Sequence, residues 1–460
     1  MGVTASRRRH LTGMSRETQI RVLIVGGGFG GVYTALELQR RLGRDREVQI
    51  TMVSRDNFLL FTPMLHEVAA SDLDITHIVN PVRKLLPGVS FFDGDVERVD
   101  LDRRTVVVAH GSDSHTHELP YDHLVIALGS VTNFFALPGL EERALTMKSL
   151  GDAIVLRNRM IALLEEADTE CCAAIRERLL TFVVAGAGFA GVETAAAVND
   201  FVREALRFYP NLSEEMIRMV LVHPGEVILP ELSESLGRYA ERKLEERGME
   251  VRARTKVSAV TETSVTLSDG TTFAASTLIW TAGTTPNPLL AMLPCTKDRG
   301  RLCVNEYLEV PGWPGVWALG DCALVPNGAS GAFHPPTAQH AIREGRCVAR
   351  NIVAALRGGS RRPFAFRTVG QLASLGRRTG VAQILGFNFS GFIAWWLWRT
   401  IYLSKLPRFE KKCRVALDWT LDLVFSKDLV KFLTATGVTI SHPPTERVEA
   451  ATVALATAQG

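Results

Sequence analysis

Two glycine-rich turns in this sequence each follow a short apolar run and precede a helical pattern. In the first, residues 20–25 are β-branched and lead into a G-x-G-x-x-G motif filled by Gly26, Gly28 and Gly31, with a helical pattern through Leu38. The first glycine permits a tight turn, the second lets the backbone approach a pyrophosphate, and the third lets helix and strand pack closely. The phosphates of a dinucleotide lie at the N-terminus of such a helix. The pattern predicts a nucleotide site.

The same motif recurs 160 residues later. Residues 180–185 form an apolar run, and Gly186, Gly188 and Gly191 fill the motif before an alanine-rich helical stretch. Two complete copies in one chain argue against glycine turns that bind nothing. The simplest interpretation is that the chain binds two dinucleotides: a flavin that stays bound and a nicotinamide that binds and leaves in each turnover.

The strand after each motif ends at residues that would meet a ribose. The first ends at Ser54 and Arg55, where an acid is expected, so a hydroxyl serves the ribose or Asp56 reaches back. The second, 219–222, ends in His223.

Further segments fit two nucleotide units. Residues 124–129 and 278–283 are buried strands that end at small residues, each where the chain crosses between the units. Another strand ends in Gly320-Asp321, and its carboxylate is available to a ribityl hydroxyl; the alternative is a turn residue. The proline and glycine signals around 337–356 predict a helix whose positive N-terminal end would stabilise a reduced isoalloxazine ring.

Length and composition narrow the class of protein. A chain of 460 residues corresponds to roughly three domains of about 150 residues each. Its 46% hydrophobic and 22% charged residues are typical of folded soluble proteins. No stretch reaches the roughly 18 apolar residues of a spanning helix, which excludes a channel or pump. The net charge of +3 argues against a nucleic-acid-binding protein.

The cysteines and histidines do not predict a metal site. The seven cysteines include no C-x-x-C pair and are interpreted as reduced, mostly buried thiols of a cytosol-facing protein. Cys171 and Cys172 are adjacent and rarely form a disulfide. His115 and His117 lie near His110 in a polar turn, where a solvated hairpin loop without metal is the preferred interpretation.

The C-terminal part differs in composition from the nucleotide units. Residues 364–386 are compatible with a short hairpin, and residues 392–403 form a dense aromatic cluster. Basic groups outnumber acids six to one over 399–414. The stretch 415–433 is amphipathic, with Leu417, Leu421 and Val424 on one face and Asp418 and Asp422 on the other.

Trp and Tyr beside Lys and Arg are typical of an anchor lying in the plane of a membrane surface. The alternative is a helical pair packed on the flavin domain or on a dimer partner.

Several motifs together resemble one family. They are GGGFGG, FTPMLHEVA at 61–69, GAGFAGVETA, LIWTAGTTPN, VWALGDCA and PPTAQHA. As an ordered set over roughly 20–432, they resemble type II NADH dehydrogenases (NADH:quinone oxidoreductases), within the flavoproteins that bind two dinucleotides. The resemblance implies an α/β fold with two Rossmann-like domains, the second inserted in the first, plus a C-terminal amphipathic helical module on the membrane surface.

The resemblance also divides the chain. It implies an FAD-binding domain at 19–150 and 303–358, an NAD(P)H-binding domain at 151–302 and a membrane-associated module at 359–435. The arginines before Glu17 predict a disordered basic arm at 1–18, and small polar residues predict a flexible tail at 436–460.

The site residues implied by the resemblance fall into three groups. Those for FAD are Gly26, Gly28, Gly30, Gly31, Ser54, Arg55, Thr62, Pro63, Val96, Ala127, Gly129, Gly320, Asp321, Ala338 and Gln339. Those for NADH are Gly186, Gly188, Gly191, Glu193, His223 and Gly283. Glu193 and Gln339 are the implied catalytic residues: Glu193 matches the carboxylate between nicotinamide, flavin and quinone, or is simply a favourable acid in a first helical turn.

The sequence departs from the family pattern at the second ribose and at the acceptor. His223 stands where Glu commonly binds the NADH ribose, and with Arg252 or Arg254 nearby it leaves the choice between NADH and NADPH open. Of the quinone-site pattern A-Q-x-A-x-Q-Q, the last two glutamines are replaced by Arg343 and Glu344.

The expected function is therefore NADH:quinone oxidoreduction through bound FAD, without proton pumping. The protein would be peripheral on the cytoplasmic face of the cell membrane (a mitochondrial membrane in a eukaryote), would take quinone from lipid, and would form a homodimer as one option. A disulfide reductase or a sulfide:quinone oxidoreductase needs reactive cysteines, and residues 54–70 contain none. A flavoprotein with a signalling or scaffold role is the alternative from another class.

Overall fold

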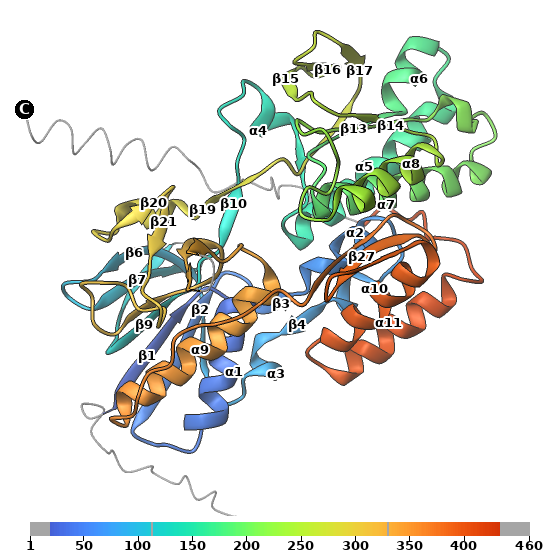
Figure 1. Cartoon of the computed structure of the whole chain (residues 1–460). Helices are drawn as coiled ribbons and strands as arrows, with labels where there is room; N and C mark the ends of the chain where they lie inside the picture. Colours follow the sequence, from blue (N-terminus) through green and yellow to red (C-terminus); the bar gives the residue numbers. More distant parts are fainter. Residues whose placement is uncertain (1–18, 112–113, 329–330, 433–460) are drawn as a thin grey trace, which may run out of the picture.

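The computed structural model describes residues 19–111, 114–328 and 331–432. Its first unit is built on a five-stranded parallel sheet, and helices α1 (Phe29–Leu42) and α9 (Ala338–Leu356) pack against each other beside it (Figure 1). The strands, in spatial order, are β22 (Val316–Ala318), β9 (His123–Ile126), β1 (Ile20–Val25), β2 (Val48–Ser54) and β5 (Ser90–Asp93). Because β22 joins strands from the first 126 residues, this sheet is assembled from two distant parts of the chain.

An antiparallel meander extends the first unit. It consists of β6 (Asp95–Asp100), β7 (Thr105–His110) and β8 (His115–Pro120). The hydrophobic core of the unit includes Val106 and Val108 of β7, so the meander belongs to the packed body of this unit.

A second parallel sheet repeats the arrangement. Its order is β11 (Leu145–Thr146), β18 (Thr277–Trp280), β12 (Thr181–Ala185), β13 (Arg218–Val222) and β14 (Met249–Arg252). It is accompanied by α5 (Leu150–Thr169), α7 (Phe189–Ala205), α8 (Glu234–Glu245) and a meander of β15 (Val257–Val260), β16 (Ser264–Leu267) and β17 (Thr272–Ala274).

Two short strands connect the sheets. β10 (Ser130–Thr132) leaves the first unit, β19 (Thr284–Pro286) returns to it, and the two pair antiparallel with Ser130 opposite Pro286 (Figure 1). The chain therefore enters and leaves the second unit through adjacent strands.

The C-terminal module packs against the junction of the two units. Its hairpin strands β26 (Gly370–Ser374), β27 (Gly380–Ile384) and β28 (Phe387–Ser390) precede α10 (Gly391–Lys405) and α11 (Phe409–Leu421). Buried Trp398 and Trp419 join the hydrophobic core that contains α7 and the short helix α2 (Leu65–Ala69). None of the helices within the described residues is both long and apolar enough to cross a bilayer.

Short elements complete the described chain. They are β3 (Phe58–Leu60), η2 (Thr62–Met64), η3 (Ile75–His77), β4 (Val79–Pro81), α3 (Val82–Leu85), α4 (Leu140–Arg143), α6 (Ala173–Leu179), η4 (Leu206–Phe208), η5 (Glu214–Met216), η6 (Pro288–Met292), β20 (Lys297–Asp298), β21 (Arg301–Cys303), η7 (Gly320–Cys322), β23 (Ala323–Leu324), β24 (Pro326–Asn327) and β25 (Ala332–Phe333).

Two expectations from the sequence need correction. The amphipathic stretch expected at 415–433 is helical only up to Leu421, as the second half of a helix that begins at Phe409. Most of the cysteines are not buried, because only Cys295 and Cys322 are, while Cys171, Cys172 and Cys413 are exposed. The arm at 1–18 and the tail at 436–460 lie outside the described residues.

Candidate functional site

The first glycine turn has the geometry of a phosphate-binding loop. The Gly26 amide donates to Val53 O at 2.9 Å, and the Val32 amide donates to Gly28 O at 3.0 Å, which fixes the turn between β1 and α1. A Cβ atom on Gly31 would overlap the carbonyl oxygen of Gly26, whereas one on Gly28 would meet no atom within 4 Å. Gly31 is therefore required for packing, and Gly28 faces open space in front of the N-terminus of α1.

Three predicted residues gather at the end of β2. Ser54 lies against the glycine turn, since a Cβ atom on Gly27 would be 2.5 Å from its Oγ. Arg55 Nε pairs with Asp95 Oδ1 at 3.3 Å, which brings the start of β6 and Val96 to the same corner. The hydroxyl of Ser54 is thus the polar group nearest the turn at the position where a ribose acid was expected.

Asp321 belongs to a polar group that the sequence did not predict. Its Oδ2 accepts a hydrogen bond from Ser130 Oγ at 2.7 Å, and Ser130 in turn accepts one from Lys148 Nζ at 2.8 Å. The Asp321 side chain is 31% exposed, so the carboxylate remains available to a ligand hydroxyl. Burial lowers the pKa of Lys148. No motif contains Ser130 or Lys148, and Gly129 and Gly320 both have positive φ angles in the turns beside this group.

Arg343 and Glu344, the two residues that depart from the quinone-site pattern, both contact other parts of the chain. Glu344 accepts a hydrogen bond from the Gly320 amide at 2.8 Å, and burial raises its pKa to about 7. The Arg343 guanidinium stacks on Phe366 at 4.0 Å from the ring centroid. Gln339, one turn earlier on α9, donates from Nε2 to Gly370 O at 3.3 Å.

The second glycine turn repeats the first. The Gly186 amide donates to Val222 O at 2.9 Å and the Val192 amide to Gly188 O at 3.0 Å, while a Cβ atom on Gly191 would overlap Gly186 O. Gly283, where the chain leaves β18, has φ +140° and lies against the ring of Phe135. The carboxylate of Glu231 lies 3.3 Å from the Cβ position of Gly188, so an acidic side chain borders this glycine turn.

His223 is buried, with only 8% of its surface exposed. Its imidazole covers Gly225, and burial lowers its pKa, which keeps the ring neutral near pH 7. The two nearby arginines are paired with carboxylates: Arg252 with Glu250 at 3.0 Å, and Arg254 with Glu226. Both arginines near His223 therefore have carboxylate partners in the structure.

Glu193 of α7 is a buried carboxylate in contact with the C-terminal module. Its Oε1 accepts hydrogen bonds from the Ser374 amide at 3.1 Å and from Trp398 Nε1 at 2.9 Å. Burial raises its pKa to about 8 despite these donors, because a carboxylate without a cationic partner loses its hydration. Tyr402 of α10 meets the ring of Phe61 edge-on with centroids 6.3 Å apart, and Phe61 directly precedes Thr62 and Pro63.

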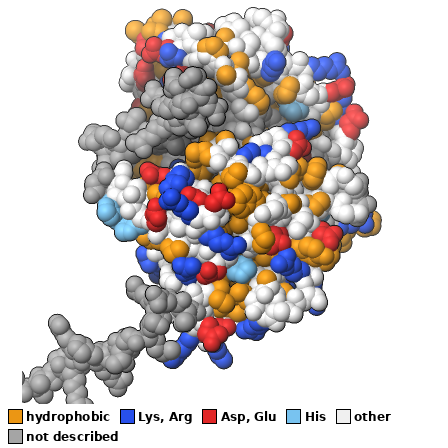
Figure 2. All heavy atoms as spheres, turned by 90° about the vertical axis from the view of Figure 1, so that its left-hand side faces the viewer, with side chains coloured by type: hydrophobic (Ala, Val, Ile, Leu, Met, Phe, Trp, Pro, Cys, Tyr) orange, Lys and Arg blue, Asp and Glu red, His pale blue; other side chains and the backbone are white. Residues whose placement is uncertain are grey.

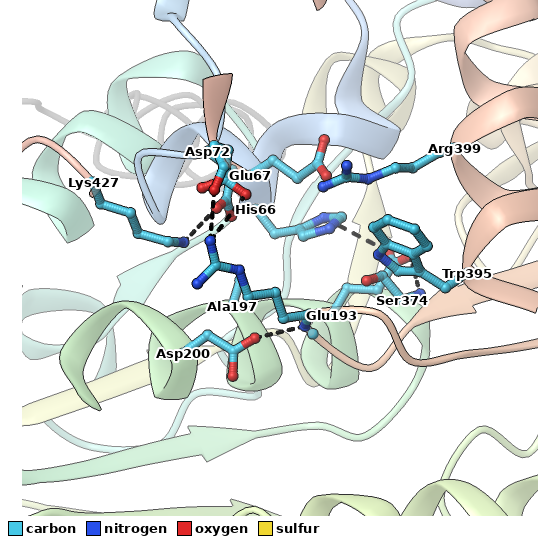
Figure 3. Close-up of a pocket in the computed structure, with 13 residues that line it drawn as sticks. His66, Glu67, Asp72, Glu193, Ala197, Asp200, Ser374, Trp395, Arg399 and Lys427 are labelled. Carbon is cyan, nitrogen blue, oxygen red and sulfur yellow. Dashed lines mark hydrogen bonds and ion pairs between the residues drawn. The ribbon is translucent and has the colours of Figure 1, made fainter. Parts of the chain in front are cut away.

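A cluster of ionisable side chains surrounds Glu193 (Figure 3). His66 Nδ1 lies 3.9 Å from Glu193 Oε2, and Glu67 accepts hydrogen bonds at 3.2 Å from Trp419 Nε1. Burial raises the pKa of Glu67 to about 8. Asp72 forms an ion pair with Lys427.

The cluster encloses a cavity of about 30 Å³, lined by Glu193, Glu67, Asp72 and Asp200 among others. One water needs roughly 10–15 Å³ by this measure, so the cavity has room for about two water molecules, and the carboxyl groups offer the polar partners such waters require.

The comparisons with known proteins agree with this geometry. The sequence pattern of the pyridine nucleotide-disulphide oxidoreductase family matches residues 20–345, and that of the NDH2 C-terminal domain matches 369–428. The chain is 32% identical over 423 residues to the type II NADH:quinone oxidoreductase Ndh of Mycobacterium tuberculosis, covering 88% of this chain and 89% of that protein. The protein belongs to the type II NADH dehydrogenase family.

Other relatives support the same family. The chain is 34% identical over 406 residues to the demethylphylloquinone reductase NdbB of Synechocystis, covering 87% of this chain and 95% of that protein. In three dimensions it is similar to NDH2 of Plasmodium falciparum in complex with NADH, with a TM-score of 0.84 over 90% of this chain and all of that one, at 19% identity. The α/β fold expected from the sequence is thereby confirmed, as is the family.

Proposed function

We propose that this type II NADH dehydrogenase binds FAD at the first glycine turn and NADH at the second, and that it reduces a membrane quinone without pumping protons. The observation that carries the proposal is the pair of phosphate-binding turns that lie on the same chain as the buried carboxyl group of Glu193. The open space at Gly28 and the exposed carboxylate of Asp321 fit a dinucleotide with a ribityl chain. Bound FAD supplies a ring that takes hydride from NADH and passes two electrons to the acceptor.

The residues of the chain divide the remaining work. Ser54 and Asp321 would hold FAD hydroxyls, while Gly186 and Gly188 would admit the NADH pyrophosphate. Glu226, paired with Arg254, would disfavour the 2′-phosphate of NADPH.

Overall, NADH, a quinone and one proton give NAD⁺ and a quinol, so one proton must come from solvent for each turnover. Glu193 carries that proton near pH 7, since its pKa is about 8. We propose that the proton reaches Glu193 through the cavity it shares with Glu67, which has room for about two water molecules.

The C-terminal module presents apolar side chains to solvent, and we propose a membrane surface as their partner. Those at least 44% exposed on or beside α10 and α11 include Phe387, Phe392, Ile393, Trp396, Phe409, Leu417, Leu421, Leu423, Val424 and Phe425. The acidic residues at the end of α11 turn inward instead: Asp418 bonds to His77, and the carboxylate of Asp422, just after the helix, lies 3.7 Å from the Arg377 guanidinium. Apolar residues that face outward beside basic ones match a surface that dips into anionic lipid.

Domain boundaries follow from the same proposal. We propose an FAD unit formed by 19–132 and 284–358, an NADH unit formed by 133–283, and a membrane module that begins at 359. The boundaries expected at 150 and 303 need correction, because β11 at 145–146 pairs within the second sheet and Leu290 and Leu293 pack in the core of the first unit. The parallel sheet that takes β22 from residues 316–318 supports the discontinuous first unit.

The central experiment reduces the bound flavin with NADH in a stopped-flow instrument and then adds a panel of quinones. The purified protein is expected to be yellow, to bleach on NADH addition and to recover its colour with quinone in less than the turnover time. A protein without flavin after gentle purification contradicts the cofactor assignment. Flavin that is reduced but is reoxidised by no quinone would favour a scaffold role instead.

A second experiment tests the membrane surface with vesicles that contain anionic lipid. Phe409→Ser with Val424→Ser should lower co-sedimentation with vesicles and activity with long-chain quinones, while leaving activity with soluble dyes intact. Phe208→Ser is the matched control, because Phe208 is 52% exposed on the NADH unit. Unchanged vesicle binding, or a change from dimer to monomer in solution, would assign this face to protein contacts.

A further inference from the structure

Three histidines meet at the end of the β7–β8 hairpin, a part of the molecule that the nucleotide sites do not use. In the antiparallel register His110 lies opposite His115, and His117 lies opposite Val108. Because side chains alternate between the faces of a strand, His115 and His117 point to the same face of the sheet, and so does His110, the cross-strand partner of His115. The register therefore brings three imidazoles together from the two strands.

The rings are in contact with one another. His110 and His117 stack with centroids 4.7 Å apart, and their Nε2 atoms are separated by 2.7 Å. His115 meets His117 edge-on at 4.8 Å, and one nitrogen from each of the three rings lies within 4.8 Å of the others. Phe92 of β5 supports the group from below, with ring centroids 5.6 Å from His110 and 5.4 Å from His117.

The chemistry of this group favours a cation ligand over an internal network. Within the described residues, none of the three imidazoles forms an ion pair with a carboxylate, and the Nε2 atoms of His110 and His117 face each other at 2.7 Å. Histidine side chains gather at the edge of the face seen in Figure 2, where solvent can deliver an ion.

We propose that His110, His115 and His117 bind one divalent cation of the zinc, copper or nickel class, with solvent at the remaining position. Imidazole nitrogen is a preferred ligand of these metals, whereas Mg²⁺ and Ca²⁺ prefer oxygen. In a tetrahedral zinc site with Zn–N bonds of about 2.0–2.1 Å, ligand nitrogens are roughly 3.3 Å apart. Here the closest pair of nitrogens is 2.7 Å apart and all three lie within 4.8 Å of one another, so small side-chain rotations would bring them to that spacing.

The ion would tie β7 to β8 at the turn end of their hairpin. The hairpin belongs to the core of the first unit through Val106 and Val108, so a metal bound only to the folded state stabilises that unit by mass action. The site is independent of the redox chemistry, because no nucleotide-binding residue proposed above is among its ligands.

The test uses the purified, flavin-loaded full-length protein after treatment with EDTA, and Zn²⁺ as the probe. Calorimetric titration and metal analysis should give one tightly bound Zn²⁺ per chain, and thermal unfolding should move to higher temperature with Zn²⁺. Co²⁺ should produce the intense visible bands of a tetrahedral nitrogen site. The double variant His115→Ala, His117→Ala should lose the bands and the thermal shift.

Controls separate this site from other ligands. Loss of an outer-shell partner alone weakens metal binding roughly 10- to 100-fold, so removal of a direct ligand by His110→Asn, on the other strand, should weaken it at least tenfold. Thr116→Ala, an exposed residue between two of the ligands, should change nothing, and neither should Cys171→Ser with Cys172→Ser. Equal Zn²⁺ affinity and stoichiometry in the double variant, with flavin content unchanged, would overturn the proposal, and so would the absence of tight binding by the unaltered protein.

Discussion

The indole nitrogen of Trp398 donates a hydrogen bond of 2.9 Å to Glu193 Oε1, which joins the C-terminal module to the first helix of the proposed NADH site. These residues are 205 positions apart in the chain. The bond holds a carboxyl group in place while offering it no full positive charge, so Glu193 keeps a pKa of about 8. The module that we propose to lie on the membrane thus also holds the carboxyl group that we propose as the proton donor.

Replacement of Trp398 by Phe should move the pH dependence of quinone reduction. Below about pH 8 Glu193 is protonated and can donate; above it the carboxylate forms and the rate of flavin reoxidation falls. The Trp398 hydrogen bond favours the charged form, so its loss raises the pKa of Glu193 and shifts the falling limb to higher pH. Stopped-flow reoxidation at a series of pH values measures this. Glu193→Gln should remove this fall in the reoxidation rate at high pH, and the rate of flavin reduction by NADH serves as the internal control. If the fall persists in Glu193→Gln, a different group is responsible for it.

Two alanine substitutions in the first glycine turn should have different consequences. Gly28→Ala adds a methyl group in open space, so the fold should survive while flavin content falls. Gly31→Ala overlaps the Gly26 carbonyl and should lower the thermal stability of the whole unit. Circular dichroism and flavin absorbance separate the two outcomes. Full flavin content in Gly28→Ala would be inconsistent with a pyrophosphate at this turn.

Lys427→Met should destabilise the protein by about 3–5 kcal/mol, because it leaves the buried acid Asp72 without its cation. Denaturant unfolding measures the change. The double variant with Asp72→Asn should recover part of the loss, since the uncompensated charge is then absent. Lys431→Met, at an exposed position, is the control and should unfold like the original protein. An equal loss in single and double variants would show that the ion pair itself matters little.

Glu226→Gln should raise the relative activity with NADPH. Its carboxylate neutralises Arg254, and without it the guanidinium is free to meet a 2′-phosphate. A charge-assisted hydrogen bond of this kind is expected to change the NADPH/NADH ratio of kcat/KM by about tenfold, or about 1.4 kcal/mol. Glu262→Gln, also exposed on the NADH unit, should leave the ratio unchanged. If the NADPH/NADH ratio is also unchanged in Glu226→Gln, Arg254 does not meet the 2′-phosphate.

The parts of the fold that were predictable carry their signal locally. β1 was expected at 20–25 and lies there, because a β-branched run followed by glycines leaves few alternatives. The helix expected at 337–356 begins at Ala338, since proline and glycine mark both ends. These signals need no knowledge of distant contacts.

The remainder depends on contacts between distant residues. The amphipathic pattern around Asp418 distinguishes two faces but does not say which one meets the protein, and here the acidic face turns inward to His77. The Ser130–Asp321 contact joins residues 191 positions apart, and no motif connects them. His110 meets His115 and His117 only once the register of the hairpin is known.

The paired strands β10 and β19 have a consequence for how such proteins are rearranged. Since the polypeptide departs at Ser130 and comes back at Pro286 directly alongside, the segment between them has its two ends side by side. A cassette of that kind can be exchanged for the corresponding cassette of a relative with only two nearby splice points. On the proposed assignment of the donor site, such an exchange would carry donor preference with it, provided that the residue facing Trp398 stays a hydrogen-bond acceptor.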